Sequence, residues 1–219
     1  MNKKQVIFSI IILVLIIDQA LKIYVKTHIP YGDGFNILGL NWARIHFIEN
    51  EGMAFGLSYG GVAGKYLLSI FRIFMVSGLL YVLYKLYKAD ESLGFIASFS
   101  LIIAGAIGNI IDSAFYGLIF SESKFHGDIA TMFPPEGGYA PFLQGKVVDM
   151  FYFPMVQSTW PDWMPVVGGE DFLFFRPVFN VADSAITVGV VLILIFYRRF
   201  FKSPSKKTDP TMTTETAEN

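Results

Sequence analysis

The sequence predicts an all-α integral membrane protein, with four transmembrane helices and two long extracytoplasmic loops that contain some β-structure. Hydrophobic residues make up 53% of the 219 residues and charged residues only 16%, against about 25% charged residues in ordinary soluble domains. Four stretches reach the length of about 20 apolar residues that a helix needs to cross a bilayer. These observations exclude a disordered chain and argue against a soluble globule, and the length favours one domain.

The four expected spans cover residues 6–24, 66–84, 93–115 and 178–197. The first span occupies the position of a secretory signal. Its apolar run, however, continues directly into Asp18-Gln19-Ala20-Leu21-Lys22, without the small residues of a cleavage site. We therefore expect a retained helix. In the first long loop, residues 41–48 alternate as in a β-strand and a Gly-rich stretch follows.

Basic residues near the span ends set the expected orientation, because cytoplasmic flanks carry the excess of Lys and Arg. The two tails and the tight turn between the second and third spans carry nine of the 17 basic residues but only five of the 18 acidic ones. We therefore expect both termini in the cytoplasm and the loops 27–65 and 116–177 outside. The expected organisation is a membrane domain over residues 1–202 and a disordered cytoplasmic tail over 203–219.

Composition removes several kinds of chemistry. The chain has no cysteine and only three scattered histidines, His28, His46 and His126. Disulfides, thiolate nucleophiles and zinc–thiolate sites are therefore excluded, and a histidine metal site is not expected. The formal net charge of −1 leaves no basic footprint for nucleic acid, so no nucleic-acid partner is expected.

Strongly polar residues inside the spans gather in the outer third of the bilayer. At 1.5 Å per residue, Asp18 and Asp112 lie about 20 and 28 Å from the cytoplasmic ends of their helices, and Arg72 and Asp183 about 10 and 8 Å from the outer ends. A charge that faces lipid costs at least about 2.5 kcal/mol, so these faces should turn inward onto one pocket. Pairs spaced i,i+3 or i,i+4 share a face, and the pocket residues are Asp18, Lys22, Arg72, Asn109, Asp112, Asn180 and Asp183.

The pocket favours carboxylate chemistry. Ser113 and Ser184 have no evident Lys or His base beside them. Two carboxylates that share a proton can activate water, because one acts as base while the other stays protonated. Asp149 follows a short apolar run at the outer surface, where it can be brought against Asp183. The pocket therefore favours aspartyl hydrolysis.

Alternatives from other functional classes remain. A proton-coupled membrane transporter also uses carboxylates within a membrane, but it predicts polar residues through the full depth or internal repeats, and neither is present. A non-catalytic membrane scaffold predicts that Asp149→Asn and Asp183→Asn are tolerated. A presenilin-type aspartyl protease would carry a G-x-G-D motif in a membrane helix, which this sequence lacks.

Five motifs in order make the chain resemble the lipoprotein signal peptidase family, the type II signal peptidases of bacteria. They run from about residue 5 to 200, and they are specific as a set although each is weak alone. The motifs are Asp18-Gln19 with Lys22, the segment Asn50-Glu51-Gly52-Met53-Ala54-Phe55-Gly56, the segment Gly105-Ala106-Ile107-Gly108-Asn109-Ile110-Ile111-Asp112, Val147-Val148-Asp149, and Phe179-Asn180-Val181-Ala182-Asp183-Ser184-Ala185-Ile186.

The resemblance implies an intramembrane aspartyl endopeptidase of the bacterial inner membrane, with its active site facing outward. It implies cleavage of diacylglyceryl-modified prolipoproteins on the N-terminal side of the lipidated cysteine. It further implies membrane lipid as surroundings, a monomer, and no metal or organic cofactor. The catalytic pair then maps onto Asp149 and Asp183, and the supporting residues are Asn50, Gly56, Asn109, Asp112, Asn180, Asp18, Lys22 and Arg72.

The sequence departs from the family pattern in two respects. The family usually has Arg directly after the third-span Asp, where this chain has Ser113. We expect Asp112 to support the pocket rather than to activate the nucleophile, with Arg72, Arg176 or Lys146 as its cationic partner and Arg176 favoured. In addition, residues 118–143 and 154–171 look like insertions into the second long loop.

Overall fold

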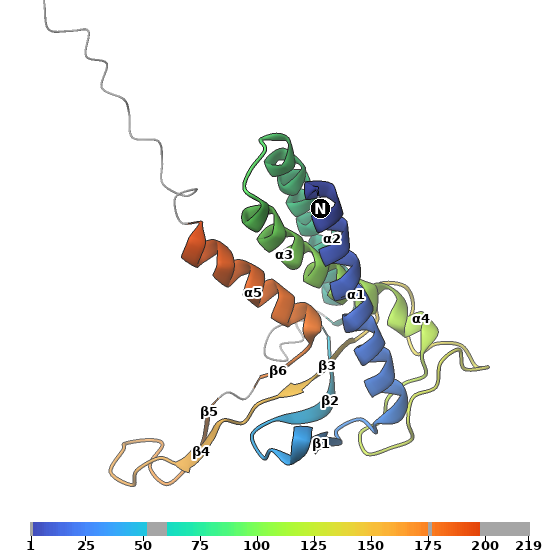
Figure 1. The fold of residues 1–219 in the computed structure, drawn as a ribbon. Helices are drawn as coiled ribbons and strands as arrows, with labels where there is room; N and C mark the ends of the chain where they lie inside the picture. The colour runs from blue at the N-terminus through green and yellow to red at the C-terminus, as the bar shows by residue number, and fades with distance from the viewer. Residues whose placement is uncertain (1, 52–60, 175–176, 198–219) are drawn as a thin grey trace, which may run out of the picture.

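The computed structural model describes residues 2–51, 61–174 and 177–197. Within them, helices α1 (Lys3–His28), α2 (Gly61–Lys88) and α3 (Leu93–Ile111) run side by side, and α5 (Val181–Phe196) packs against α3 (Figure 1). A small β-sheet lies at one end of this helical layer, beside the end of α1 and the start of α5 (Figure 1). The expected tail 203–219 lies outside the described residues.

Three helices among the described residues are long and apolar enough to cross a membrane: α1, α2, and the continuous segment Leu93–Ile119 that begins with α3. This segment continues from α3 through a π-helical turn, η3 (Asp112–Tyr116), into the short α4 (Gly117–Ile119). The fourth expected span is shorter than predicted, because α5 has 16 residues. It begins after Asn180, and Val178–Phe179 form strand β6 instead.

The two long loops contain β-structure, as the sequence predicts. Strands β1 (Gly34–Asn36), β2 (Arg44–Asn50), β3 (Val147–Tyr152) and β6 form an antiparallel sheet in the order β1-β2-β3-β6. The predicted strand around 41–48 is confirmed as β2. Its register pairs Ile48 with Asp149, and this pairing brings the two long loops together.

The two expected insertions have different structures. The segment 118–143 leaves α4 and runs irregularly past the sheet, with isolated bridges between Tyr31 and Phe125 and between Phe120 and Met132. The segment 154–171 contains most of a hairpin made of β4 (Val156–Thr159) and β5 (Asp171–Phe174), which projects away from the helices (Figure 1).

Close helix packing depends on two glycines of α3. A Cβ at Gly105 would overlap the carbonyl oxygen of Ala182 on α5, and a Cβ at Gly108 would lie 2.8 Å from a carboxylate oxygen of Asp18 on α1. Small residues let membrane helices approach closely. The two glycines therefore allow α1, α3 and α5 to converge where the polar residues lie.

A hydrophobic core anchors the sheet to the helices. It contains Val25 and Ile29 from the end of α1, Phe47 from β2, and Val148 and Met150 from β3, together with Tyr116 and Phe120. Side chains alternate along a strand, and the two fully buried β3 residues, each 0% exposed, flank Asp149. Packing of this core therefore directs Asp149 to the opposite face of β3.

Candidate active site

The start of α5 is a capping box built from two of the predicted site residues. Asn180 Oδ1 accepts a hydrogen bond from the backbone N–H of Asp183 at 2.9 Å, and Asp183 Oδ2 accepts one from the backbone N–H of Asn180 at 3.3 Å. Such reciprocal caps satisfy free donors at a helix start. The cap also fixes the side-chain amide of Asn180, because its oxygen faces the helix and its Nδ2 must point away.

The outward-pointing amide of Asn180 meets Asp149. Asn180 Nδ2 donates to Asp149 Oδ1 at 2.7 Å, and Asn50 Nδ2 at the end of β2 donates to Asp149 Oδ2 at 2.5 Å. Both oxygens of this carboxyl therefore accept hydrogen bonds from neutral amides. Asp149 is only 3% exposed, so it is held in a buried position without a direct cationic partner among the ion pairs of the described residues.

Asn109 joins the second carboxylate to a buried lysine. Its Nδ2 donates to Asp183 Oδ1 at 2.8 Å, while its Oδ1 accepts from Lys22 Nζ at 2.9 Å and from Asn180 Nδ2 at 3.2 Å. Lysine can only donate, which fixes the orientation of the Asn109 amide. Three asparagines therefore hold Asp149 and Asp183 from different elements of the fold, in one continuous hydrogen-bond network.

Lys22 lies at the centre of a second, fully buried cluster. Its Nζ lies 2.9 Å from Asp18 Oδ2 and 2.8 Å from Asp112 Oδ2, and all three side chains are 0% exposed. Gln19 Nε2 donates to Asp112 Oδ1 at 2.9 Å, and Asp18 Oδ1 accepts from the backbone N–H of Ala182 at 2.9 Å. The cluster therefore joins α1, α3 and α5, and Lys22 connects it to Asn109, which binds Asp183.

This cluster supplies a cationic partner of Asp112 that was not predicted. Lys22 takes this role, because the i,i+4 spacing from Asp18 places its ammonium between the two carboxylates. Neither Arg72 nor Lys146 forms an ion pair with Asp112 among the described residues. Arg72 Nη1 instead donates to Ser113 Oγ at 3.3 Å. Lys146 lies just before β3, with its Nζ 5.7 Å from the ring centre of Tyr139. Arg176, which was favoured, lies outside the described residues.

Electrostatics distinguish Asp149 within the site. Burial raises the pKa of the Asp149 carboxyl from its ordinary 3.8 to about 7, and the negative charge of Asp183 acts in the same direction. Hydrogen bonds from Asn50 and Asn180 partly oppose this rise in the pKa. A carboxyl that is protonated near neutral pH beside a second carboxylate is the arrangement needed for combined acid and base catalysis.

The structure brings together most of the residues selected from the sequence. Asp18, Lys22, Asn50, Asn109, Asp112, Asp149, Asn180 and Asp183 share one hydrogen-bonded network, and the charges of Asp112, Asp149 and Asp183 act on the Arg72 guanidinium. Gly56 lies outside the described residues. No group of three or more His, Asp or Glu side chains in the described part of the chain has the arrangement of a metal site.

Sequence reasoning missed a third buried ion pair, between Lys26 and Glu49. Lys26 on α1 pairs with Glu49 on β2 and donates to Ser123 Oγ at 2.8 Å. The signal was present in the sequence, because Lys26 follows Asp18 and Lys22 at the same four-residue interval. Residues at this interval lie on one face of a helix, so the inward face of α1 extends one turn further than predicted.

Apolar helices packed around buried carboxylates and amides define a polytopic membrane protein with a polar site at one end of its helices. Residues 10–199 match the family described as "Signal peptidase (SPase) II". The chain is 48% identical over 217 residues to a lipoprotein signal peptidase of Porphyromonas gingivalis, which covers 98% of this chain and 93% of that protein. The chain therefore belongs to the signal peptidase II family, a family of peptidases.

Two further comparisons agree with this membership. The chain is 35% identical over 211 residues to a lipoprotein signal peptidase of Amoebophilus asiaticus, which covers 95% of this chain and 84% of that protein. A solved structure described as a bacterial membrane enzyme at 2.3 Å resolution is similar with a TM-score of 0.57. It has 23% sequence identity and covers 93% of both chains, so it supports the fold.

Proposed function

We propose that this protein removes the signal peptide from diacylglyceryl-modified prolipoproteins as an intramembrane aspartyl endopeptidase, and that it cuts on the N-terminal side of the lipidated cysteine. Asp149 and Asp183 are the catalytic pair in this proposal. The observation that carries it is one hydrogen-bonded network in which Asn50 and Asn180 bind the Asp149 carboxyl and Asn109 binds the Asp183 carboxyl. The family name and its peptidase relatives support the substrate class.

The proposed reaction uses the two carboxyls in different states. Asp149 is the more buried and holds the shared proton, and Asp183 is the base. Asp183 takes a proton from water, the hydroxide adds to the scissile carbonyl carbon, and Asp149 gives its proton to the carbonyl oxygen. Collapse of this intermediate breaks the C–N bond. Asp183 then protonates the leaving nitrogen and Asp149 recovers its proton, which restores the starting state.

The remaining polar residues keep this pair in place. Lys22 donates to Asn109, which in turn donates to Asp183, so the lysine acts on the catalytic base only through an amide. Lys22 is itself held by Asp18 and Asp112. Asp112 also accepts a hydrogen bond from the backbone N–H of Val148 at 3.3 Å. We therefore infer that Asp112 is a positioning residue that joins α3 to the catalytic strand β3.

The apolar surroundings suit the proposed substrate. The helices that carry the site also expose large apolar residues, including Ile12 and Ile16 on α1 and Val188 and Val191 on α5. These faces can contact lipid and acyl chains, while the polar network takes the peptide bond. We propose a multi-pass protein of the bacterial inner membrane that functions as a monomer without a cofactor, with residues 1–202 as the membrane domain, both termini in the cytoplasm and the site facing outward.

A cleavage assay tests this function. The purified protein is incubated in lipid with a prolipoprotein that carries the diacylglyceryl group and with the same precursor without the lipid. We expect a mass loss equal to the signal peptide, with the new N-terminus at the lipidated cysteine, for the lipidated precursor only. Cleavage at another bond, or equal cleavage of both precursors, contradicts the proposed specificity.

A further inference from the structure

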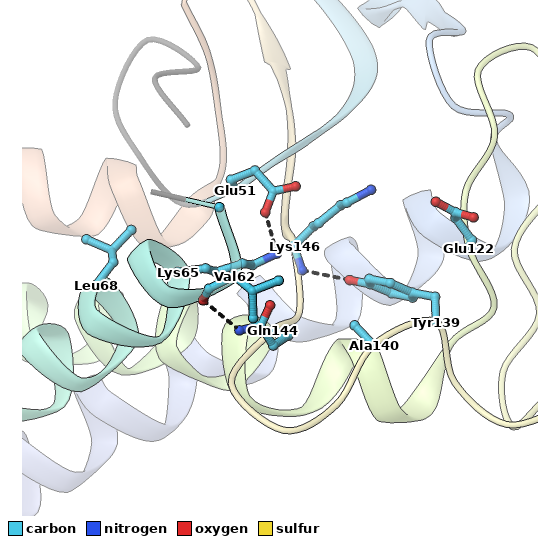
Figure 2. A pocket seen from close by; sticks show the side chains of 10 residues that line it. Glu51, Val62, Lys65, Leu68, Glu122, Tyr139, Ala140, Gln144 and Lys146 are labelled. Carbon is cyan, nitrogen blue, oxygen red and sulfur yellow. Dashed lines mark hydrogen bonds and ion pairs between the residues drawn. The ribbon is translucent and has the colours of Figure 1, made fainter. Parts of the chain in front are cut away.

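A cavity of about 400 Å³ lies beside the candidate active site and contains neither carboxyl of the pair (Figure 2). This outer cavity is open on one side and is lined by the residue after β2, by the first turns of α2, by the segment 118–143 and by the residues that lead into β3. Its polar lining residues are Glu51, Lys65, Glu122, Tyr139, Gln144 and Lys146. The volume is within the usual range for small-ligand sites.

Hydrogen bonds fix the walls of the outer cavity. Gln144 Nε2 donates to the carbonyl oxygen of Val62 at 3.2 Å, and Ser69 Oγ donates to that of Leu143 at 3.0 Å, so the loop is attached to α2 at two points. The Tyr139 hydroxyl oxygen accepts from the backbone N–H of Lys146 at 2.6 Å (Figure 2). Hydrogen bonds therefore hold the described walls of the cavity together.

The buried ion pair of Lys26 and Glu49 anchors the same loop from behind. Lys26 Nζ donates to Ser123 Oγ at 2.8 Å, and it lies 5.4 Å from the ring centre of Phe120 and 5.1 Å from that of Tyr139. Ser123 is next to Glu122, and Tyr139 lines the cavity. The segment that looks like an insertion therefore supplies one wall of the cavity and is fixed to α1 and β2.

The outer cavity is adjacent to the catalytic pair along both central strands. Glu51 directly follows Asn50, whose amide binds Asp149. Lys146 precedes Asp149 by three residues of chain, a separation of about 10 Å along a strand. On α2, Lys65, Leu68 and Arg72 share one face, which leads from the cavity to Ser113. A polypeptide held at the two carboxyls can therefore continue into the cavity.

The charged residues of the outer cavity favour an acidic ligand. Lys65 is paired with Glu51 at 2.5 Å, and Glu122 is exposed to solvent, where its charge is screened. Lys146 is half-buried, and its Nζ lies over the Tyr139 ring. No ion pair of Lys146 occurs among those of the described residues. Its ammonium is therefore available for an acceptor or a carboxylate of a bound chain.

We propose that the outer cavity is a subsite for the first residues that follow the lipidated cysteine, and that Lys146 favours an acidic side chain there. This inference rests on the proposed function, in which the signal peptide stays in the membrane and the mature chain leaves outward. A polar, charged cavity does not suit acyl chains, whereas it suits a solvated polypeptide. Because segment 118–143 forms one wall of the outer cavity, we expect the preference for an acidic residue only in proteins that carry this segment.

The test compares diacylated peptide substrates that differ only after the lipidated cysteine. One ends there as an amide, and two continue for three residues with either Asp or Asn next to the cysteine. For the wild type we expect a KM about threefold to tenfold lower for the Asp peptide than for the Asn peptide, the effect of one partly exposed charged contact. Lys146→Met should abolish this difference and leave the KM of the short substrate unchanged.

Controls separate the subsite from general damage. Lys124→Met removes an exposed lysine of the same segment that does not line the cavity, and should keep the Asp preference. Lys146→Arg should keep it too, and the thermal midpoint of Lys146→Met reports on folding. The proposal is overturned if Lys146→Met retains the preference, or if it raises the KM of the short substrate as much as that of the long ones.

Binding measurements test the subsite independently of cleavage. The Kd values of the Asp and Asn peptides are measured on Asp183→Asn protein with and without Lys146→Met. A preference for the Asp peptide that disappears with Lys146→Met supports the subsite. This holds even if the wild-type protein cuts none of the peptides, a result that would contradict only the proposed function. Equal affinities for the two peptides overturn the subsite while leaving the proposed function intact.

Discussion

Replacing Asp149 by Asn should stabilise the folded protein at pH 8, and its effect on stability should become more favourable as the pH rises. The Asp149 carboxyl is 3% exposed and both its oxygens accept amide hydrogen bonds. Its pKa is raised from 3.8 to about 7, by burial first and by Asp183 second. An Asn side chain has nearly the shape of the protonated carboxyl but never ionises, so it avoids the cost of a buried charge beside Asp183. Its Nδ2 cannot accept the second amide hydrogen bond, and this loss of about 1–3 kcal/mol does not change with pH.

The sign and size of this change in stability follow from the raised pKa of Asp149. Below pH 3.8 both the folded and the unfolded chain carry the proton, so Asp149 costs nothing. Between pH 3.8 and about 7 the unfolded carboxyl ionises first, and the wild type loses stability as the pH rises. The full cost above pH 7 is about 4 kcal/mol, and at pH 5 it is about 2 kcal/mol. The advantage of Asp149→Asn should therefore be larger by about 2 kcal/mol at pH 8 than at pH 5.

Thermal unfolding in detergent at pH 5 and pH 8 measures this difference. We expect the midpoint of Asp149→Asn to lie above that of the wild type by several degrees more at pH 8 than at pH 5. Asp128→Asn is the control, because Asp128 is exposed in the segment 118–143 and its replacement should shift neither midpoint. An equal shift at both pH values, or a lower midpoint of Asp149→Asn at pH 8, would refute the assignment of a raised pKa to Asp149.

Three further predictions concern the surrounding site and the topology. Lys22→Met should destabilise the protein by about 3–5 kcal/mol in chemical unfolding, because it leaves the buried carboxylates of Asp18 and Asp112 without a cation; an unchanged midpoint would contradict this account of the cluster. Asp112→Ala should lower the cleavage rate and the thermal midpoint together, and loss of cleavage at full stability would show that Asp112 acts in the chemistry itself. A reporter fused to the carboxyl terminus should be active only in the cytoplasm, and activity in the oxidising compartment alone would overturn the charge-based orientation.

Much of the site could be predicted from the sequence, because polar residues are costly inside apolar helices. Asp18, Asn109 and Asp183 had to face inward at a similar depth, and the structure places them in one network. The capping role of Asn180 follows from local chemistry as well, since Asn is a preferred residue at helix starts. Local spacing was sufficient wherever the partner lay on the same helix or at a helix end.

Pairing between distant segments could not be predicted in the same way. The partner of Asp112 was sought among residues near the outer mouth, although Lys22 lies about 24 Å along its helix, level with Asn109. Choosing Lys22 required knowing that α1 packs against α3 at Gly108, a contact that depends on tertiary geometry. The β2–β3 register has the same origin: it pairs Asn50 with Val147, two residues from Asp149, and the Asn50 side chain binds the Asp149 carboxyl.

The loops were the least predictable part of the fold. A four-stranded sheet forms because residues 34–50 meet residues 147–179, which are far apart in the sequence. Short strands rich in Gly, Pro and aromatic residues give weak alternation, so only β2 was visible in advance. The pair of Lys26 and Glu49 also joins a helix to a strand, and only its helical half had a signal in the sequence.

The most direct test of the central claim measures cleavage by protein in which one carboxyl of the pair is an amide. Asp149→Asn, Asp183→Asn and the control Asp128→Asn are purified at matched folding, and the lipidated precursor is followed by mass spectrometry together with its binding to each variant. If the two carboxyls share a proton and carry the reaction, both site variants bind the precursor but release no signal peptide. The control then cleaves like the wild type. Cleavage at the wild-type rate by either site variant would contradict the claim that Asp149 and Asp183 carry the reaction.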